Sequence, residues 1–269
     1  METPVPIAVM ESAVSGGARV PPRLAPTPEG DRPACALARK LDGFAPLTEQ
    51  DRTALVDLIG HVRPVERHAV LVEQDSVPDH ALIVFAGFAS RYKRRVSGRR
   101  QIVAYLVPGD LCDRGALHGH PLHHTLETLT PCHIAKVPRA AYLDLLGRHP
   151  RIALALQRAR FVEEATAREW VVNLGMRSGV ERMAHLLCEL MERLGSIGQV
   201  TDGQYDLPLT QLDLADTLGL SSVHVNRVLQ VLRRDGLISL QGRCLHILAP
   251  RRLRQLAEFE VAYLKAGYL

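Results

Sequence analysis

LTQLDLADTLGLSSVHVNRVLQVLRRDGLISLQGRCLHI, residues 209–247, is the stretch that decides the fold. Thr210 stands where it can cap a first helix, and Gly219 stands where it can end that helix in the left-handed conformation. Ser221 follows two residues later and can cap a second helix. Two short helices joined by a tight turn that contains glycine are typical of a helix-turn-helix unit.

Both helices of this unit carry apolar residues at helical spacing, which predicts one buried face on each. After Gly236, two short strands at 237–240 and 244–248 surround a turn at 241–243, which is typical of a hairpin wing. An ordinary pair of helices with a solvated face is the alternative, but the two caps, the glycine turn and the wing together favour a winged helix-turn-helix. The predicted buried residues are Leu212, Leu214, Ala215 and Leu218 on the first helix, and Val225, Val228, Leu229 and Leu232 on the second.

The second helix of such a unit lies in the major groove of double-stranded DNA, where its first exposed residues meet the base edges. Arg227 can pair with both acceptors of a guanine. Arg233 and Arg234 lie one to two turns further along and are expected to contact phosphate. The predicted DNA-binding residues are Thr210, Gln211, Ser221, Ser222, His224, Asn226, Arg227, Arg233 and Arg234.

Between residues 62 and 137, short runs rich in Val, Ile, Leu and Phe alternate with turn residues such as Gly87 and Gly98. Many short strands at regular spacing predict an antiparallel sandwich or roll. A helix that Thr48 can cap precedes them. Helices therefore flank the strands on both sides, and the fold class is α+β. The predicted strands are 69–72, 81–85, 88–92, 101–107, 126–129 and 133–137.

A long helix is predicted from Pro150 to Met176, because proline suits the first helical position. Mostly small residues recur in it every seven positions, as at the seam between two helices. Packing against the chain's own domain is the alternative, but the stripe is too polar for a fully buried helix and favours a dimer seam. Ser178 and Glu181 then form a capping box for the next helix. The predicted dimer-interface residues are Ile152, Ala155, Ala159, Val162, Thr166 and Trp170.

The composition is that of a globular protein. The chain has 269 residues, 46% of them hydrophobic, and a formal net charge of +4, which is compatible with nucleic acid. Residues 1–33 are rich in Pro, Gly and small residues, and we expect them to form a disordered tail. No apolar run is long enough to span a bilayer, and the N-terminus lacks the basic start of a secretory signal, so we expect a cytoplasmic protein without a membrane partner. The five cysteines are scattered and odd in number, which argues against a disulfide framework.

The segment LPLTQLDLADTLGLSSVHVNRVLQVLRRDGLI, residues 207–238, resembles the DNA-binding domain of the CRP/FNR superfamily. The segment GRRQIVAYLVPGDLCD, residues 98–113, is similar to the stretch that leads into the effector pocket of that family. The resemblance implies an N-terminal antiparallel β-roll like a cyclic-nucleotide-binding domain, a long dimerisation helix and a C-terminal winged helix-turn-helix. The implied division is a tail at 1–33, a β-roll sensor at 34–148, a dimerisation helix at 149–176 and a DNA-binding domain at 177–269.

As a function, the resemblance implies a sequence-specific transcription regulator that binds a palindromic operator as a homodimer and contacts RNA polymerase. The recognition-helix arginine of the family corresponds to Arg227. A glutamate that many members use to read a base corresponds to Val223, so the usual operator sequence of the family is in doubt and His224 and Asn226 become candidates for readout. The sign of regulation and the target genes are left open.

The effector is left unknown, because the ligand residues of the family are missing. Members that bind cyclic nucleotide carry a Gly-Glu pair and an arginine that neutralises the phosphate. Here the pair is absent, and His123 or His124 stands at the arginine position, so we expect no binding of cyclic AMP. Members with an iron–sulfur centre carry clustered N-terminal cysteines, of which only Cys35 is present. A small molecule, a redox signal, a metal or no effector at all stay open, and no cofactor is assigned.

Several histidines gather near two cysteines, but their spacing matches no metal site, so a polar loop with partly buried histidines is the favoured interpretation. Their protonation near pH 6 is an alternative input. Cys188 is expected to fill the core, whereas Cys244, beside Arg243, is a weaker candidate for a reactive thiolate. The residues in question are His118, His120, His123, His124 and His133, with Cys112 and Cys132.

Nothing in the sequence supports catalysis. No Ser/His/Asp arrangement, nucleotide-binding loop or pair of carboxylates stands at a catalytic spacing, so we expect a protein that is not an enzyme and assign neither catalytic nor metal-binding residues. An enzyme or metal protein built on the β-roll, and a binding module without a DNA role, are the two alternatives. Neither of them accounts for the helix-turn-helix and its arginines.

Overall fold

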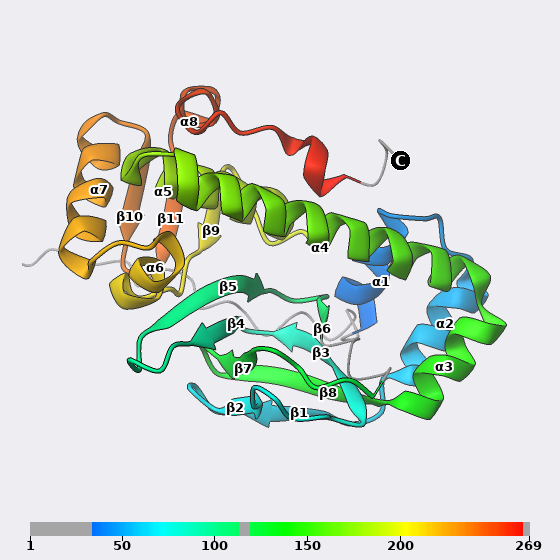
Figure 1. Ribbon diagram of the computed structural model, residues 1–269. Coiled ribbons are helices and arrows are strands. Elements are labelled where there is room, and N and C mark those ends of the chain that lie inside the picture. Colours follow the sequence, from blue (N-terminus) through cyan, green and yellow to red (C-terminus); the bar gives the residue numbers. More distant parts are fainter. Residues whose placement is uncertain (1–33, 113–118, 266–269) are drawn as a thin grey trace, which may run out of the picture. The chain divides into compact units, whose positions relative to one another are not determined.

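The computed structural model describes residues 34–112 and 119–265, and the predicted tail at 1–33 lies outside them. Two four-stranded antiparallel sheets form a β-roll, with strand orders β1-β8-β3-β6 and β2-β7-β4-β5 (Figure 1). This confirms the predicted α+β class and its N-terminal roll. The strands are β1 (Val62–Val65), β2 (Val70–Val72), β3 (His80–Ala86), β4 (Ala89–Arg94), β5 (Arg100–Leu106), β6 (Leu111–Cys112), β7 (Thr125–Thr128) and β8 (Cys132–Pro138).

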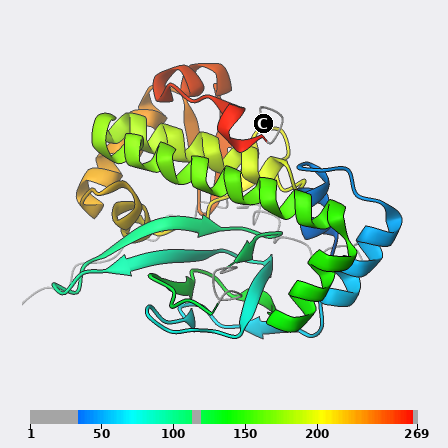
Figure 2. The same ribbon diagram turned by 45° about the vertical axis from the view of Figure 1, so that its right-hand side comes forward.

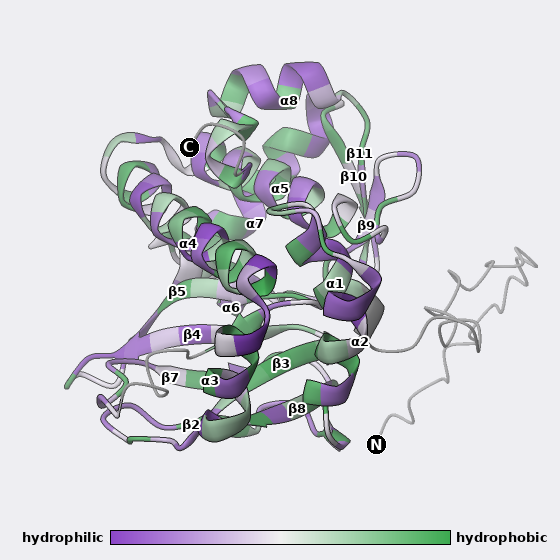
Figure 3. Cartoon of the chain, turned by 90° about the vertical axis from the view of Figure 1, so that its right-hand side faces the viewer, coloured by the Kyte–Doolittle hydropathy of each residue, from purple (hydrophilic) through white to green (hydrophobic). Residues whose placement is uncertain are grey.

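The two sheets bury an apolar core between them, to which both contribute alternate residues, as the two-residue period of a strand requires. β3 is hydrophobic from Ala81 to Ala86, and Figure 3 shows most of the strand in green. The turn from β3 to β4 requires glycine, because Gly87 has a φ of 83° and a Cβ at this position would lie 2.4 Å from the carbonyl oxygen of Pro131. The core residues include Val72, Leu82, Val84, Ala89, Leu106, Leu126 and Ile134.

All six predicted strands are present within one or two residues of their predicted ends. β1 was not predicted, because it contains Pro64, which cannot donate a hydrogen bond to a neighbouring strand. The structure resolves this conflict by placing β1 at a sheet edge, where it pairs only with β8. β6 is only two residues long, and the short helix α1 (Ala34–Asp42) was also not predicted.

Two of the helices around the roll begin at the capping residues that the sequence predicted. Thr48 caps α2 (Glu49–Leu58) in a capping box with Asp51. α3 (Arg139–Arg148) leads into α4 (Pro150–Met176), which lies along the β5 side of the roll (Figures 1 and 2). Ser178 and Glu181 form the predicted capping box of α5 (Gly179–Gly195). No helix in the part of the chain that the structure describes has the length and apolar character needed to cross a membrane.

Three residues of the predicted dimer stripe of α4 are buried within the chain itself. Ile152 and Ala155 are fully buried in a cluster that includes residues of α1, α3 and β3, and Trp170 is buried near α5. These three side chains have no area left to bury against a partner. The spacing identified one side of the helix, and the structure shows that these three residues of it face the chain's own core.

A buried carboxylate holds the junction of α4 and α5. Glu189 on α5 is fully buried and accepts hydrogen bonds from Trp170 Nε1 at 2.8 Å, Arg193 at 3.1 Å and the Tyr263 hydroxyl at 3.2 Å. Tyr263 belongs to the 3₁₀ segment Val261–Leu264, which follows α8 (Pro250–Ala257). Three donors offset the cost of burying the charge and tie the C-terminal segment to both helices. Cys188, one position before Glu189, is fully buried as predicted.

His185 lies in the same junction without a hydrogen-bond partner among the described residues. Its ring stacks on Tyr263 at 6.0 Å and meets the edge of Phe259 at 5.2 Å. Glu169 Oε2 lies 3.6 Å from Nε2. Burial, assisted by the charge of Arg177, lowers the pKa of His185 to about 4, so the folded chain holds the neutral ring at neutral pH.

We expect His185 to make the fold less stable in weak acid. The unfolded chain binds a proton at His185 below about pH 6.5, whereas the folded chain does not until about pH 4, so stability falls as the pH falls through this window. Between pH 7.5 and pH 5 this one group should cost about 2 kcal/mol. His185→Phe should lose that part of the pH dependence in urea unfolding. His133→Gln, which alters an exposed histidine of β8, should retain it. Equal pH dependence of wild type and His185→Phe would contradict the expectation.

Candidate nucleic-acid interface

The helix-turn-helix forms as the sequence predicts. Thr210 caps α6 (Gln211–Leu218) in a capping box with Asp213, and Gly219 ends the helix in the left-handed conformation with φ 65° and ψ 33°. Ser221 caps α7 (Ser222–Arg234) by accepting from the backbone of His224 at 3.2 Å. Arg182 of α5, which the sequence did not single out, donates to the carbonyl of Leu218 at 2.9 Å and so satisfies the end of α6.

The two helices pack through the predicted apolar faces with one exception. The four predicted residues of α7 are buried, as are three of those on α6. Leu212 is the exception, because it is 58% exposed. It lies one turn before Asp216 on the side of α6 toward the β-roll, where it lines a shallow groove. The buried set is Leu214, Ala215, Leu218, Val225, Val228, Leu229 and Leu232.

α7 presents a mostly polar outer face. Arg227 is exposed and forms no ion pair with the described residues. Asn226 is half-buried, and its Oδ1 accepts from Gln230 at 2.9 Å, which holds two amide side chains together on the surface of the helix. Val223 is 64% exposed on the same helix. The first half of this face offers the Arg227 guanidinium and a pair of amides to an outside partner.

The remaining predicted DNA-binding residues differ in whether their polar groups are free to contact DNA or already form hydrogen bonds within the chain. Arg233 is exposed, whereas Arg234 donates to Asp235 at 3.1 Å. The Thr210 hydroxyl donates to Asp213 Oδ2 at 2.6 Å. Gln211, Ser221 and His224 are exposed and Ser222 is half-buried, all near the turn between the helices.

A wing follows α7, as predicted. β10 (Ile238–Gln241) and β11 (Cys244–Ile247) form a hairpin, and β9 (Gln204–Asp206), which was not predicted, pairs with β11. Arg243 at the turn donates to both oxygens of Asp206, at 3.2 and 2.6 Å. Cys244 is half-buried and its sulfur contacts Gln204 at 3.7 Å.

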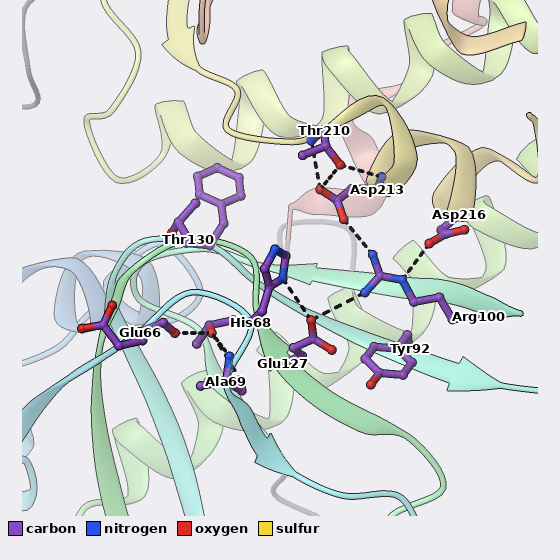
Figure 4. A network of polar contacts seen from close by, with 12 residues as sticks. Glu66, His68, Ala69, Tyr92, Arg100, Glu127, Thr130, Thr210, Asp213 and Asp216 are labelled. Atoms are coloured by element: carbon purple, nitrogen blue, oxygen red, sulfur yellow. Dashed lines mark hydrogen bonds and ion pairs between the residues drawn. The ribbon is translucent and has the colours of Figure 1, made fainter. Parts of the chain in front are cut away.

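One guanidinium joins the β-roll to the helix-turn-helix (Figure 4). Arg100, at the start of β5, donates to Asp216 at 2.6 Å and to Asp213 at 2.8 Å, and lies 3.7 Å from Glu127 of β7. Burial would lower the pKa of Arg100, but the three carboxylates outweigh it and raise the pKa above its usual value. Asp213 therefore holds Arg100 with one oxygen and caps α6 with the other.

Two further contacts support this junction. Tyr105 of β5 is fully buried and its hydroxyl forms a hydrogen bond with Thr217 of α6. Gln101 donates to the carbonyl of Thr217 at 2.9 Å. The sequence analysis missed the whole junction, because Arg100 and Asp213 are 113 positions apart and no local pattern connects them.

A cavity of about 770 Å³ lies between α4, β5 and α5. Ala159, Val162 and Thr166, which the sequence assigned to the dimer seam, are half-buried and line this cavity. Trp170 and Tyr105 also line it. α4 therefore forms one wall of this cavity.

The histidines of the predicted polar loop do not come together as a metal site. His124 lines the cavity, His123 lies 3.7 Å from Asp75, and His133 is exposed on β8. His118 lies outside the described residues. Among the residues that are described, no group of three or more His, Cys, Asp or Glu side chains is arranged to hold a metal ion.

Comparison with known proteins agrees with this architecture. Residues 62–149 match the family of cyclic nucleotide-binding domains, and residues 181–256 match the Crp-like helix-turn-helix domains. The chain is 30% identical to the nitrogen fixation regulation protein FixK of Azorhizobium caulinodans over 186 residues, which cover 69% of this chain and 74% of that protein. It is 30% identical to the transcriptional activatory protein AadR of Rhodopseudomonas palustris over 223 residues, 83% of this chain and 91% of that one. Among solved structures, FixK2 from Bradyrhizobium japonicum is 26% identical with a TM-score of 0.65, over 73% of this chain and 96% of that one.

We expect Arg100→Gln to weaken the junction strongly, because it removes the guanidinium that the nearly buried carboxylates of Asp213 and Glu127 share. The loss in free energy of unfolding should be about 2–4 kcal/mol at pH 7. Asp216→Asn should cost less, and the double variant should resemble Arg100→Gln alone, because both changes remove the same ion pair. Arg99→Gln, the exposed neighbour, serves as the control. Additive losses in urea unfolding would show that the ion pair is not what joins the domains.

Proposed function

The chain belongs to the CRP/FNR superfamily and is a DNA-binding transcription regulator of that type, and we propose that it acts as a homodimer that reads a palindromic operator with α7. The observation that carries the proposal is the capped α6–Gly219–α7 unit with Arg227 exposed on its outer face. A second half-site about one helical turn away would be read by the same residues of the partner subunit.

Base readout is proposed to rest on Arg227. Its guanidinium has no carboxylate partner among the described residues, so binding a guanine would break no existing ion pair. Asn226 and Gln230 already hold each other, and an adenine would have to compete with that hydrogen bond. Val223 offers only an apolar surface, which suits a thymine methyl group better than the base that a glutamate reads.

The dimer surface is proposed to be the side of α4 opposite to the buried stripe. Leu154 and Phe161 are 42% and 45% exposed and lie seven positions apart, and Val172 and Met176 continue the same face at 43% and 84%. Large apolar side chains this exposed, in a row on one helix, are typical of an interface. The outer stripe replaces Ile152, Ala155 and Trp170 as the proposed contact with the partner.

The finer parts of the proposal follow from the relatives. AadR is named a transcriptional activatory protein, which supports a proposal that the dimer also contacts RNA polymerase and activates transcription in the cytoplasm. We assign no catalytic reaction to the chain. The division into a sensor at 34–148, a dimerisation helix at 149–176 and a DNA-binding domain at 177–269 is kept as a proposal, with the cavity beside α4 as the place for an effector.

We expect Phe161→Glu to dissociate the dimer. Two buried charges and two lost phenylalanine contacts per dimer should raise the dissociation constant at least about 100-fold. Light scattering on the full chain measures this change. Leu143→Glu is a matched control, because Leu143 is 44% exposed on α3 and off the stripe. An unchanged dimer of Phe161→Glu would exclude this face.

We expect Arg227→Ala to cost about 1–3 kcal/mol per half-site and to relax the preference at one base position. The operator is first selected from a random pool of duplexes, and then single-base changes are titrated. Arg234→Ala is the comparison, because Arg234 should at most contact phosphate and its loss should weaken all sequences alike. If Arg227→Ala keeps full affinity and the same base preference, our docking of α7 is wrong and His224 becomes the better candidate for readout.

A further inference from the structure

The β4–β5 hairpin carries an unusual density of positive charge. Its end reads KRRVSGRR over residues 93–100, with five cations in eight residues and no acidic residue among them. Lys93, Arg94, Arg95 and Arg99 are exposed and form no ion pair with the described residues. Only Arg100 is neutralised, by the carboxylates of the junction. The other four cations keep their charge facing outward.

The backbone holds these cations in a fixed turn. Arg95 donates to the carbonyl of Arg99 at 2.8 Å and Gly98 donates to the carbonyl of Arg95 at 2.9 Å. Gly98 has a φ of 82°, which glycine adopts without strain. Arg94 lies directly opposite Arg100 in the strand pair. Arg94 also lies over the ring of Tyr92, 5.6 Å from its centroid, which holds this cation on the surface of the hairpin.

The hairpin end lies beside the helix-turn-helix. Arg100 fixes the start of β5 to α6, and a groove of about 560 Å³ has Arg94 and Arg99 on one side and Ser221 and Ser222, at the start of α7, on the other. Figure 1 shows the end of the hairpin extending on the side where α6 and α7 lie. A polyanion that meets the first turn of α7 therefore passes next to the hairpin cations.

We propose that the β4–β5 hairpin end, residues 93–99, binds the phosphate backbone of DNA next to the half-site that α7 reads. The sensor domain would thus contact DNA directly. Guanidinium groups suit this partner because they bind phosphate oxygens with two parallel hydrogen bonds. The inference rests on the proposed function, since it places DNA at α7, and it adds contacts from a different domain. An acidic protein or a membrane would not explain why the groove is shared with the recognition helix.

The test compares Arg95→Gln/Arg99→Gln with wild type as full chains. Two duplexes are used, the selected operator alone and the operator with about 10 base pairs added on each side. Affinity is measured by fluorescence anisotropy at several salt concentrations. On the long duplex the double variant should bind at least about 10-fold more weakly, and its salt slope should be shallower by about 2 per protomer, because each neutralised phosphate contributes about 0.9. On a duplex too short to reach the hairpin, the two proteins should bind alike.

Arg63→Gln/Arg151→Gln is the control, because it removes the same charge from β1 and from the first turn of α4. It should leave the slope on the long duplex unchanged. An equal loss in this control would show that only net charge matters and would overturn the inference, as would a double variant with the wild-type slope on both duplexes. If the wild type selects no operator, the proposed function is overturned as well. If Arg227→Ala loses its base preference while Arg95→Gln/Arg99→Gln keeps the affinity and salt slope of the wild type, this inference alone is overturned.

Discussion

The carboxylate of Asp213 is the constraint on which the arrangement of the DNA-binding helices depends. One oxygen accepts from the Thr210 backbone at 2.9 Å and caps α6, while the other accepts from Arg100 at 2.8 Å and holds the β-roll. The side chain is almost fully buried. Neither contact can be broken without leaving a desolvated charge with half its partners, which is far more costly than losing an exposed ion pair. The start of the helix-turn-helix and its docking on the sensor are therefore held by the same group.

Local patterns made the helix-turn-helix predictable, and distant contacts explain what was missed. Thr210, Gly219 and Ser221 act within a few residues of themselves, so their roles can be derived from the sequence. In the sequence, Arg100 is one of several cations in a basic turn. Nothing nearby indicates its role, because its partners on α6 are more than a hundred positions away. Leu212 was assigned to the buried face by spacing alone, yet it is exposed. It lies on the side of α6 that faces the β-roll, where the contacts are polar and offer no apolar surface to cover it.

The long helix α4 shows a different limit. Its apolar residues lie on two sides. One side covers the core and the cavity, while the other carries Leu154, Phe161 and Val172, which are seven and then eleven positions apart. Spacing identifies residues that share a face but not what that face contacts. The small residues at 155, 159 and 166 suggested a close helix pair, but they pack against the chain's own core or line its cavity. Larger residues at the outer positions are what a partner helix could bury.

Net charge conceals how the charges are distributed over this molecule. The sum of +4 is modest, and three carboxylates, Asp213, Asp216 and Glu127, lie near the start of the helix-turn-helix, where they would repel a phosphate backbone. Arg100 forms ion pairs with these carboxylates. Because the cluster is largely shielded from water, it contributes little positive or negative potential at the surface. The exposed charge around this site then comes from arginines without carboxylate partners among the described residues, on α7 and on the hairpin end. An internal ion-pair cluster thus converts a nearly balanced sequence into a surface on which positive charge predominates where DNA would lie.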